Sequence, residues 1–302
     1  MTFDAIILGG GPAGLQAALT LGRMHLDVLL IDSGVYRNDP AAHSHNMLTR
    51  DGVPPSELRA IARDQLHAYG SVEVRGTVAS VVARADDGTF DVTTPDGVER
   101  ARRLLLATGV RDALPAVPGL APLFGTLAAH CPFCHGHEYA GRRVAVIGAV
   151  HAAGRALMMS RIAGELVVLT DGADLDEADL TMLDAHGIAV RAEPILQIGS
   201  PNGEQRVDVQ LEGGDVIEVG GILTATTFAQ SAPFAEQLGL DLLPSGCVEV
   251  DVFGRTSMPG VYAAGDLAHV PELPMPMSSV LTSAAAGLTA AATLLRELVV
   301  VP

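Results

Sequence analysis

Residues 5–14 read AIILGGGPAG, an apolar run that passes directly into a glycine-rich turn. A helical run extends to about Met24, and a second apolar run over residues 28–31 ends at Asp32. This is the G-x-G-x-x-G pattern between strand and helix, with an acid after the next strand. It predicts a Rossmann-like domain with a bound dinucleotide, whereas the alternative is a purely structural glycine turn. The expected dinucleotide contacts are Gly9, Gly11, Pro12, Ala13, Gly14 and, at the adenosine ribose, Asp32.

A second copy of the pattern lies in the middle of the chain. An apolar run over residues 144–147 leads into Gly148, and the apolar run 166–169 is followed by Asp171. Gly148 and Asp171 are 23 residues apart, which is also the separation between the first glycine and the acid of the first copy. The repeated spacing indicates an internal duplication of the nucleotide-binding fold.

The second turn departs from the pattern at the position that faces phosphate. Val150 replaces the second glycine, so its isopropyl group is expected to displace a pyrophosphate. Acidic residues follow where a basic group would hold a 2′-phosphate: Asp171, Asp174, Asp176, Glu177 and Asp179. NADPH binding is therefore expected to be impaired, and NADH binding is left open.

Between the two copies lies the stretch Cys131-Pro132-Phe133-Cys134-His135. Two thiols at this spacing can close into a disulfide, and the histidine can move a proton near neutral pH. The same spacing could be half of a zinc site, but only Cys247 remains as a further cysteine, so no metal is expected. Redox chemistry with Cys131, Cys134 and His135 is the favoured interpretation, and a capping or packing role is the alternative for His135. Structural or solvated roles are expected for His43, His45, His137 and His269, of which His269 is an additional site candidate.

The composition limits the partners of the chain. Its 302 residues carry a net charge of -16, with a pI near 4.9 and no basic cluster, so nucleic-acid and anionic-membrane partners are not expected. Residues 278–295 carry no charge, but small residues dominate and Arg296 follows, which favours a buried helix over a membrane span. A start without a basic region and only three cysteines favour a reducing cytoplasm.

The order of the expected strands predicts two domains. Short alternating strands are expected over residues 71–100, and buried strands are expected before Gly109 and before Asp266. Joints rich in glycine and proline lie near residues 115–118 and 244–246. The predicted fold class is α/β with two Rossmann-like, three-layer domains, the second inserted in the first. The expected ranges are 1–113 and 244–302 for the first domain and 114–243 for the insertion with the CxxC.

Several motifs, in order along the chain, resemble those of low-molecular-weight thioredoxin reductases. They are GGGPAG at 9–14, ATG at 107–109, the CxxC followed by His-Gly, VIG at 146–148 and AAGD at 263–266. The resemblance covers essentially the whole chain and implies FAD on the first domain, a CxxC that reaches the flavin, and a homodimer. It also implies flavin contacts by Arg37, Asn46, Val78, Thr108, Gly109, Gly265 and Asp266. Asn46 is as well explained by a turn-forming role.

Three departures make the chain more similar to one branch of these flavoproteins. His135 stands where the reductases typically carry aspartate, the second turn lacks its glycine, and residues 276–279 replace the usual Arg-Gln. The core of the CxxC resembles that of the gliotoxin and holomycin dithiol oxidases, which pass electrons from a dithiol to oxygen. Further residues resemble those at the matching positions of bacterial members of this branch. They are Tyr36-Arg37-Asn38, His43, His45, Arg50-Asp51-Gly52 and Pro54-Pro55.

The leading hypothesis is an FAD-dependent dithiol oxidase that works without NADPH on a small dithiol or a thioredoxin-like protein. The resemblance implies that Cys131 exchanges with substrate and that Cys134 is the sulfur next to the flavin. The N-terminal N–H groups of the last helix, from about Ser278, are expected to face the flavin and stabilise negative charge on its reduced ring, and close helix packing is the alternative. One alternative is an NAD(P)H-dependent thioredoxin reductase-like enzyme, and another is a non-catalytic flavin redox sensor.

Overall fold

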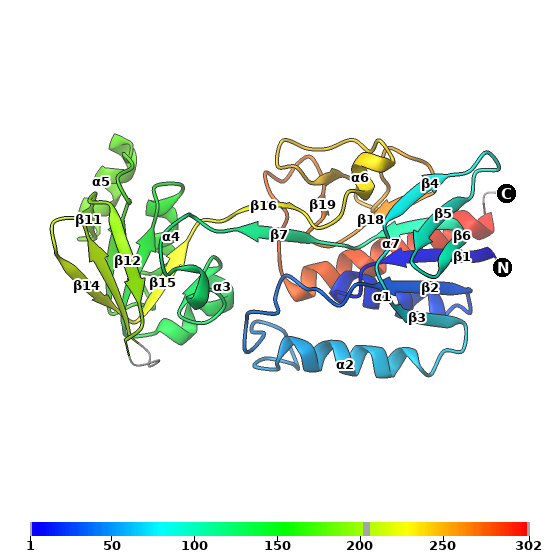
Figure 1. Ribbon diagram of the computed structural model, residues 1–302, viewed down its shortest axis with the longest axis horizontal. Coiled ribbons are helices and arrows are strands. Elements are labelled where there is room, and N and C mark those ends of the chain that lie inside the picture. The colour runs from blue at the N-terminus through cyan, green and yellow to red at the C-terminus, as the bar shows by residue number, and fades with distance from the viewer. Residues whose placement is uncertain (1, 202–205, 301–302) are drawn as a thin grey trace. The chain divides into compact units, whose positions relative to one another are not determined.

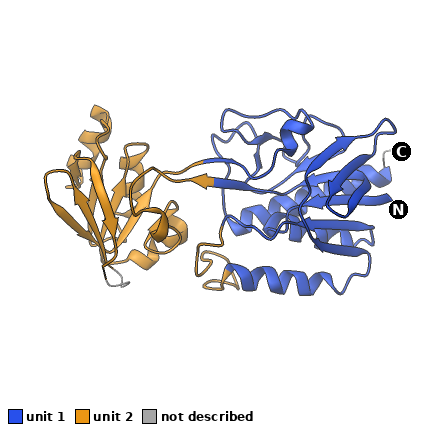
Figure 2. Ribbon diagram, viewed as in Figure 1, with its two compact units in different colours: residues 1–37, 55–111, 228–302 blue, residues 38–54, 112–227 orange. Residues whose placement is uncertain are grey.

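The computed structural model describes residues 2–201 and 206–300, which group into two compact units (Figure 1, Figure 2). The first unit comprises residues 1–37, 55–111 and 228–302, and the second comprises residues 38–54 and 112–227. The division differs from the expected one, since residues 228–243 group with the first unit. Phe234 and Leu238 are buried in the core of that unit, a long-range contact that a local glycine or proline joint does not reveal.

A seven-stranded sheet forms the centre of the first unit. Its strands are β1 (Thr2–Leu8), β2 (Val28–Asp32), β3 (Val72–Gly76), β4 (Val81–Arg84), β5 (Phe90–Thr94), β6 (Gly97–Leu106) and β18 (Val261–Ala263). Their order is β3-β2-β1-β6-β5-β4, with β18 also paired to β6. Strands β1, β2, β3, β6 and β18 are parallel, while β4 and β5 are antiparallel neighbours. Every residue of β2 is buried, as expected for a parallel strand covered on both faces.

Alternate side chains of the sheet contribute to two separate hydrophobic clusters. Ala5 and Ile7 belong to the cluster that includes α1 (Pro12–Gly22) and α7 (Val280–Val300). Ile6 and Leu8 belong to the other cluster, together with residues of β5 and of the segment after β16. Helix α2 (Pro55–Leu66) follows the irregular segment 38–54 and contributes Leu66 to the first cluster. The period-2 pattern of a strand therefore produces the layers of this unit.

Small residues on α7 allow this helix to approach α1 closely. A Cβ added at Gly287 would overlap the backbone carbonyl of Ala13, so the two helices meet through their backbones. Helix α7 is long and apolar enough to span a membrane by length and composition alone. Its buried residues, including Ala290 and Leu294, instead pack in the core with α1, as in a helix of a soluble domain.

The second unit has a smaller parallel sheet. Its strands are β8 (Ala128–Ala129), β9 (Arg143–Ile147), β10 (Glu165–Leu169), β11 (Ala189–Arg191) and β15 (Gly221–Thr224), in the order β11-β10-β9-β15-β8. A three-stranded antiparallel sheet contains β12 (Ile195–Gly199), β13 (Val207–Leu211) and β14 (Val216–Val219). The helices are α3 (Pro132–His135), α4 (Ala152–Met159) and α5 (Glu177–Ala185). The α/β class and the repeated strand–turn–helix pattern are thus confirmed.

The remaining elements are short. The list comprises β7 (Val110–Ala113), β16 (Thr227–Gln230), β17 (Val248–Glu249), β19 (Ala268–His269), α6 (Phe234–Gln237) and the 3₁₀ turns η1 (Ala121–Leu123) and η2 (His137–Tyr139). Strand β7 pairs with β16, and the chain passes between the units within these strands.

Candidate active site

The first glycine turn is shaped by contacts that exclude side chains. Gly9 has φ +112, and a Cβ there would overlap the carbonyl oxygen of Ala107. A Cβ at Gly10 would overlap the carboxylate of Asp32, and one at Gly14 would overlap the carbonyl of Gly9. Gly11 differs, because nothing lies within 4 Å of the position that its Cβ would take. The protein itself does not require glycine at position 11, so the open space fits a group that approaches the backbone, such as a pyrophosphate.

Asp32 ends β2 and is only 5% exposed. Its carboxylate accepts hydrogen bonds from the Tyr36 hydroxyl, from the Arg63 guanidinium and, at 3.1 Å, from the backbone N–H of Gly34. Burial acts to raise the pKa of this carboxyl, but the bonds from Tyr36, Gly34 and Arg63 outweigh it and hold the pKa below its ordinary value. Asp32 is therefore an ionised acceptor at the end of the strand, as binding a ribose hydroxyl requires. The contact from Arg63 was not expected, since helix α2 reaches Asp32 only through the tertiary fold. Tyr36 was noted only for its resemblance to the branch, without a role at Asp32.

Two of the expected flavin contacts, Arg37 and Asp266, lie together although they are distant in the sequence. Arg37 Nη1 is 2.7 Å from an Asp266 carboxylate oxygen and 2.9 Å from Ser278 Oγ. Ser283 Oγ donates to the other Asp266 oxygen at 3.2 Å. A hollow of about 210 Å³ lies here and is lined by Gly265, Asp266 and residues of α7. The contacts bring charged and polar groups to one place, which fits the polar chain of a flavin dinucleotide.

The other expected flavin contacts occupy loops. Thr108 and Gly109 follow β6, directly after Ala107, whose carbonyl touches the first turn. Val78 is exposed and follows β3. Asn46 has φ +60, and its backbone N–H donates to Asp51 at 2.7 Å within the second unit. The structure thus shows the turn role of Asn46, and the flavin contacts of Asn46, Val78, Thr108 and Gly109 stay predictions.

The cysteine pair is closed into a disulfide in the second unit. Cys131 and Cys134 have their Cα atoms 5.3 Å apart, within the usual range for a disulfide. Cys131 is the N-cap of α3, and Pro132 occupies the first turn, where its missing N–H leaves no hydrogen bond unmade. Phe133 between them is exposed. The short helix therefore holds both cysteines, each half-buried, on either side of the exposed Phe133.

His135 ends the same helix and has one free ring nitrogen. Nε2 lies 3.3 Å from the carbonyl oxygen of Gly125, so this nitrogen carries the proton and donates it. Nδ1 is buried and has no hydrogen-bond partner among the described residues. Burial lowers the pKa of His135 below its ordinary value, although the Gly125 carbonyl and the nearby charge of Glu138 act to raise it. At neutral pH the imidazole is therefore uncharged, with Nδ1 as a base.

Glu138 and His45 extend this group of titratable side chains. Glu138 Oε1 is 3.4 Å from His45 Nε2, while Glu138 Oε2 is buried without a described hydrogen-bond partner. His45 Nδ1 is in turn 3.7 Å from Asp51. Sequence reasoning did not select Glu138, although it lies three residues after His135, a spacing that places both on one side of a helical turn. The role of His45 depends on the segment 38–54 packing in the second unit, for which the sequence carried no signal.

The remaining candidate residues fall into two groups. His269 and Cys247 are buried and bonded to neighbouring residues, whereas His43 and His137 are exposed. His269 is 6% exposed, with Nδ1 2.9 Å from the Val270 carbonyl and Nε2 2.7 Å from Ser245 Oγ. It lines the hollow beside Asp266, but both ring nitrogens are occupied. His43 and His137 are exposed. Cys247 is buried, with its sulfur 3.5 Å from the Asp266 carbonyl, and burial raises its pKa.

The second glycine turn has a different construction. No atom lies within 4 Å of the Cβ position at Gly148, and Val150 is 63% exposed. His151 adopts a left-handed conformation, with φ +52, before α4 begins at Ala152. Asp171 does not present a free carboxylate, since it accepts a 2.6 Å hydrogen bond from the backbone N–H of Ile195.

The fold has two Rossmann-like units, and the site has a glycine turn and a disulfide next to a basic imidazole. Together they define a class of protein, the disulfide oxidoreductases with two dinucleotide-binding-type domains. The family model described as pyridine nucleotide-disulphide oxidoreductase matches residues 3–291, and the chain belongs to this family. Thioredoxin reductase sirT of Leptosphaeria maculans is 32% identical over 309 residues, with 95% of this chain and 92% of the relative covered. Thioredoxin reductase aclD of Aspergillus oryzae is 34% identical, with 87% and 88% covered.

Solved structures show the same relationship. An oxidoreductase from Agrobacterium tumefaciens is 33% identical, with a TM-score of 0.91 and complete coverage of both chains. HlmI is 30% identical, with a TM-score of 0.91 and coverage of 99% of this chain and 93% of that chain. The expected family and its two-domain Rossmann fold are therefore confirmed. Membership makes the chain a thioredoxin reductase-like disulfide oxidoreductase and implies that it binds FAD.

Proposed function

We propose that the chain is an FAD-dependent dithiol oxidase that converts a dithiol to a disulfide, with oxygen as the final acceptor. The observation that carries the proposal is the closed Cys131–Cys134 disulfide beside His135, whose unprotonated Nδ1 has no partner among the described residues. The first glycine turn, the ionised Asp32 and the Arg37–Asp266 pair are the groups proposed to hold FAD. When bound, FAD supplies a two-electron acceptor that molecular oxygen can reoxidise.

The first step is thiol–disulfide exchange at Cys131. A substrate thiolate attacks the sulfur of Cys131, the Cys131–Cys134 bond breaks, and Cys134 leaves as a thiolate. The second substrate thiolate then attacks the substrate sulfur of the mixed disulfide, and Cys131 leaves as a thiolate. The substrate has lost two electrons and two protons, and the cysteine pair has gained the two electrons. The assignment of Cys131 to substrate and Cys134 to the flavin follows the family resemblance.

His135 is proposed to remove the substrate protons. Thiols react as thiolates, and a neutral imidazole can take their protons near neutral pH. The Gly125 carbonyl fixes the proton on Nε2, which leaves Nδ1 as the accepting atom. Glu138 adds negative charge beside the imidazolium that forms, and this charge favours protonation of His135. Glu138 is in this proposal a positioning residue.

The oxidase direction is favoured by the second glycine turn. In a reductase the electrons come from NAD(P)H bound at such a turn. Here Val150 occupies the phosphate-facing position, His151 precedes the helix in a left-handed conformation, and Asp171 bonds to Ile195. The acidic side chains after β10 would also repel a 2′-phosphate. These features support a dithiol as electron donor.

Anaerobic reduction of the bound flavin tests this proposal. The purified yellow protein is mixed with NADH, NADPH or dithiothreitol as a small dithiol, and the flavin absorbance is followed. We expect bleaching by the dithiol alone, followed by oxygen uptake when air is admitted. Rapid bleaching by NADPH would falsify the oxidase proposal in favour of an NADPH-dependent reductase. Slow, substoichiometric bleaching with every donor would indicate a redox sensor.

The remaining expectations form part of the same proposal. A small dithiol is the favoured substrate class, a thioredoxin-like protein is the alternative, and a cytoplasmic homodimer is the expected form. Replacement of Cys134 by serine should abolish turnover while the flavin stays bound. The matched replacement of buried Cys247 by serine should leave turnover in place, because that sulfur has no route to exchange.

A further inference from the structure

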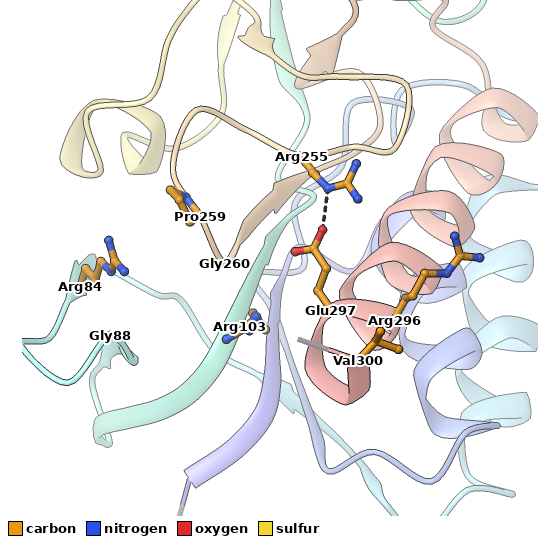
Figure 3. Close-up of a pocket in the computed structure, with 9 residues that line it drawn as sticks. All are labelled: Arg84, Gly88, Arg103, Arg255, Pro259, Gly260, Arg296, Glu297 and Val300. Atoms are coloured by element: carbon orange, nitrogen blue, oxygen red, sulfur yellow. Dashed lines mark hydrogen bonds and ion pairs between the residues drawn. The ribbon is translucent and has the colours of Figure 1, made fainter. Parts of the chain in front are cut away.

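A second hollow lies in the first unit, apart from the glycine turn. It has a volume of about 470 Å³, within the range of small-molecule sites. Figure 3 shows its lining residues, which come from three places: the β4–β5 turn, β6 with the loop before β18, and the end of α7. The residues are Arg84, Gly88, Arg103, Arg255, Pro259, Gly260, Arg296, Glu297 and Val300. None of them belongs to the groups proposed to hold FAD.

The hollow is basic in a chain that is strongly acidic overall. Four arginines line it with a single carboxylate, although the whole chain has 19 basic and 35 acidic residues. The net charge of -16 repels anions in general, so a local surplus of guanidinium groups is not a property of the average surface. This local reversal of sign indicates a site for an anion.

The one carboxylate of the hollow is already occupied. Glu297 accepts a 2.5 Å hydrogen bond from Arg255 Nε and another, also 2.5 Å, from the Tyr262 hydroxyl. Arg255 in addition donates to Asp251 at 3.0 Å. Burial acts to raise the pKa of Glu297, but the bonds from Tyr262 and Arg255 outweigh it and hold the pKa below its ordinary value. Glu297 therefore stays ionised and bound to Arg255, and the positive charge of Arg103 also acts to lower its pKa.

The other three arginines differ in how far they are engaged, because Arg103 also interacts with the Tyr262 hydroxyl and with Glu297. Arg103 uses Nη1 to bond the Arg102 carbonyl at 2.9 Å, but its Nε is buried without a hydrogen-bond partner in the described part of the chain. Arg84 and Arg296 are exposed, and neither makes an ion pair with another described residue. Figure 3 shows Arg84 and Arg296 on opposite sides, with Arg103 between them. The exposed guanidinium groups of Arg84 and Arg296 therefore have donors available to an anion.

We propose that this arginine hollow binds a phosphoryl dianion, as free phosphate or as the phosphate of a small phosphomonoester. Guanidinium groups present paired N–H donors that match phosphate oxygens, and the hollow offers such groups from different elements. Pro259, Gly260 and Val300 form an uncharged part of the lining. The small organic group of a phosphomonoester can pack against it. The proposal does not depend on the direction of the redox reaction.

Calorimetric titration of the FAD-loaded protein at constant ionic strength tests the proposal. The probes are inorganic phosphate, ribose 5-phosphate and, as an uncharged control, ribose. We expect saturable binding of one or both phosphates and no binding of ribose. Tighter binding of ribose 5-phosphate would identify a phosphomonoester as the occupant, and equal binding would identify free phosphate.

Three variants locate the site. Arg296→Gln and Arg103→Gln should each weaken phosphate binding by about tenfold or more, because each removes charge-assisted hydrogen bonds. Arg206→Gln is the matched control, since Arg206 is an exposed arginine of the second unit paired with Asp208 at 2.9 Å, and its loss changes the net charge equally. Arg296 is exposed on α7, so its variant is expected to fold even if the Arg103 variant does not. Absence of saturable binding, or equal weakening by Arg206→Gln, overturns the proposal.

Discussion

In the first strand–turn–helix copy, Gly9, Gly10 and Gly14 each face a neighbour that leaves no room for a methyl group. In the second copy, Gly148 corresponds to Gly9 and has nothing within 4 Å of its Cβ position, and Ala153 takes the place of Gly14. The two copies share the 23-residue spacing of glycine and acid, yet only one has a turn closed tightly on itself with an open face at Gly11. The two copies therefore share their spacing but differ in the packing around their glycines, and this difference supports the proposal that the first copy holds the dinucleotide.

The acidic residues of the two copies differ in the same way. Asp32 lies inside β2, buried and held ionised by Tyr36, Gly34 and Arg63. Asp171 lies beyond the end of β10 and binds the backbone of Ile195. In the second unit the proposed chemistry lies instead at the Cys131–Cys134 disulfide and His135.

The largest effect is expected from adding a methyl group at the third residue of each helix. Gly14→Ala should lose most of its flavin and destabilise the fold by about 1–3 kcal/mol, because the Cβ overlaps the Gly9 carbonyl. Gly154→Ala, at the same place in α4, should instead gain about 0.5–1 kcal/mol, since the site is open and helical. Flavin absorbance per chain and urea unfolding measure both. Equal behaviour of the two variants would remove the distinction between the turns.

The next effect concerns the base in the second unit. His135→Gln keeps an N–H that can donate to the Gly125 carbonyl but has no basic nitrogen, so dithiol-driven flavin reduction should slow by about 100-fold. The control is His137→Gln, because His137 is exposed and two residues away. Stopped-flow absorbance without oxygen measures the rate. A rate unchanged by His135→Gln would assign the proton transfer to another group.

A smaller effect is expected from introducing the missing glycine into the second turn. Val150→Gly removes the isopropyl group from the phosphate-facing position and should speed flavin reduction by NADH by several-fold, about the effect of one relieved steric contact. NADPH should gain less, because Asp171 and the acidic residues after it repel the 2′-phosphate. The ratio of the two anaerobic rates is the readout. An equal gain for both cofactors would show that charge does not discriminate at this turn.

The smallest effect is a shift in pH dependence. The base form of His135 is the neutral imidazole, so the dithiol half-reaction should be full above its lowered pKa and fall as the pH drops through that value. Glu138→Gln removes a charge that raises the pKa of His135, and the acid limb should move to lower pH. His45→Asn removes a charge that lowers the pKa, and the limb should move to higher pH. Shifts in the same direction for both variants would contradict the electrostatic account.

Short segments accounted for much of the candidate site. The glycine turn with Asp32, the disulfide pair and His135 were expected from spacing alone, because each depends on residues close together in the chain. Glu138 was missed although it is near His135, since a lone glutamate on a polar turn has no distinguishing pattern. Arg63 and the pairing of Arg37 with Asp266 could not be inferred, because their partners come from remote parts of the fold.

The amino-acid sequence by itself determined the α/β class, the duplicated unit, the redox pair and the family, because alternating apolar runs, glycine positions and CxxC spacing act over a few residues. Only the tertiary structure decided which acid is buried and held ionised at the end of its strand, that residues 38–54 bring His45 to Glu138, and that four arginines line one hollow. The physical reason is that burial, ion pairing and charge surplus arise from contacts between segments whose separation in the chain carries no information about their distance in space.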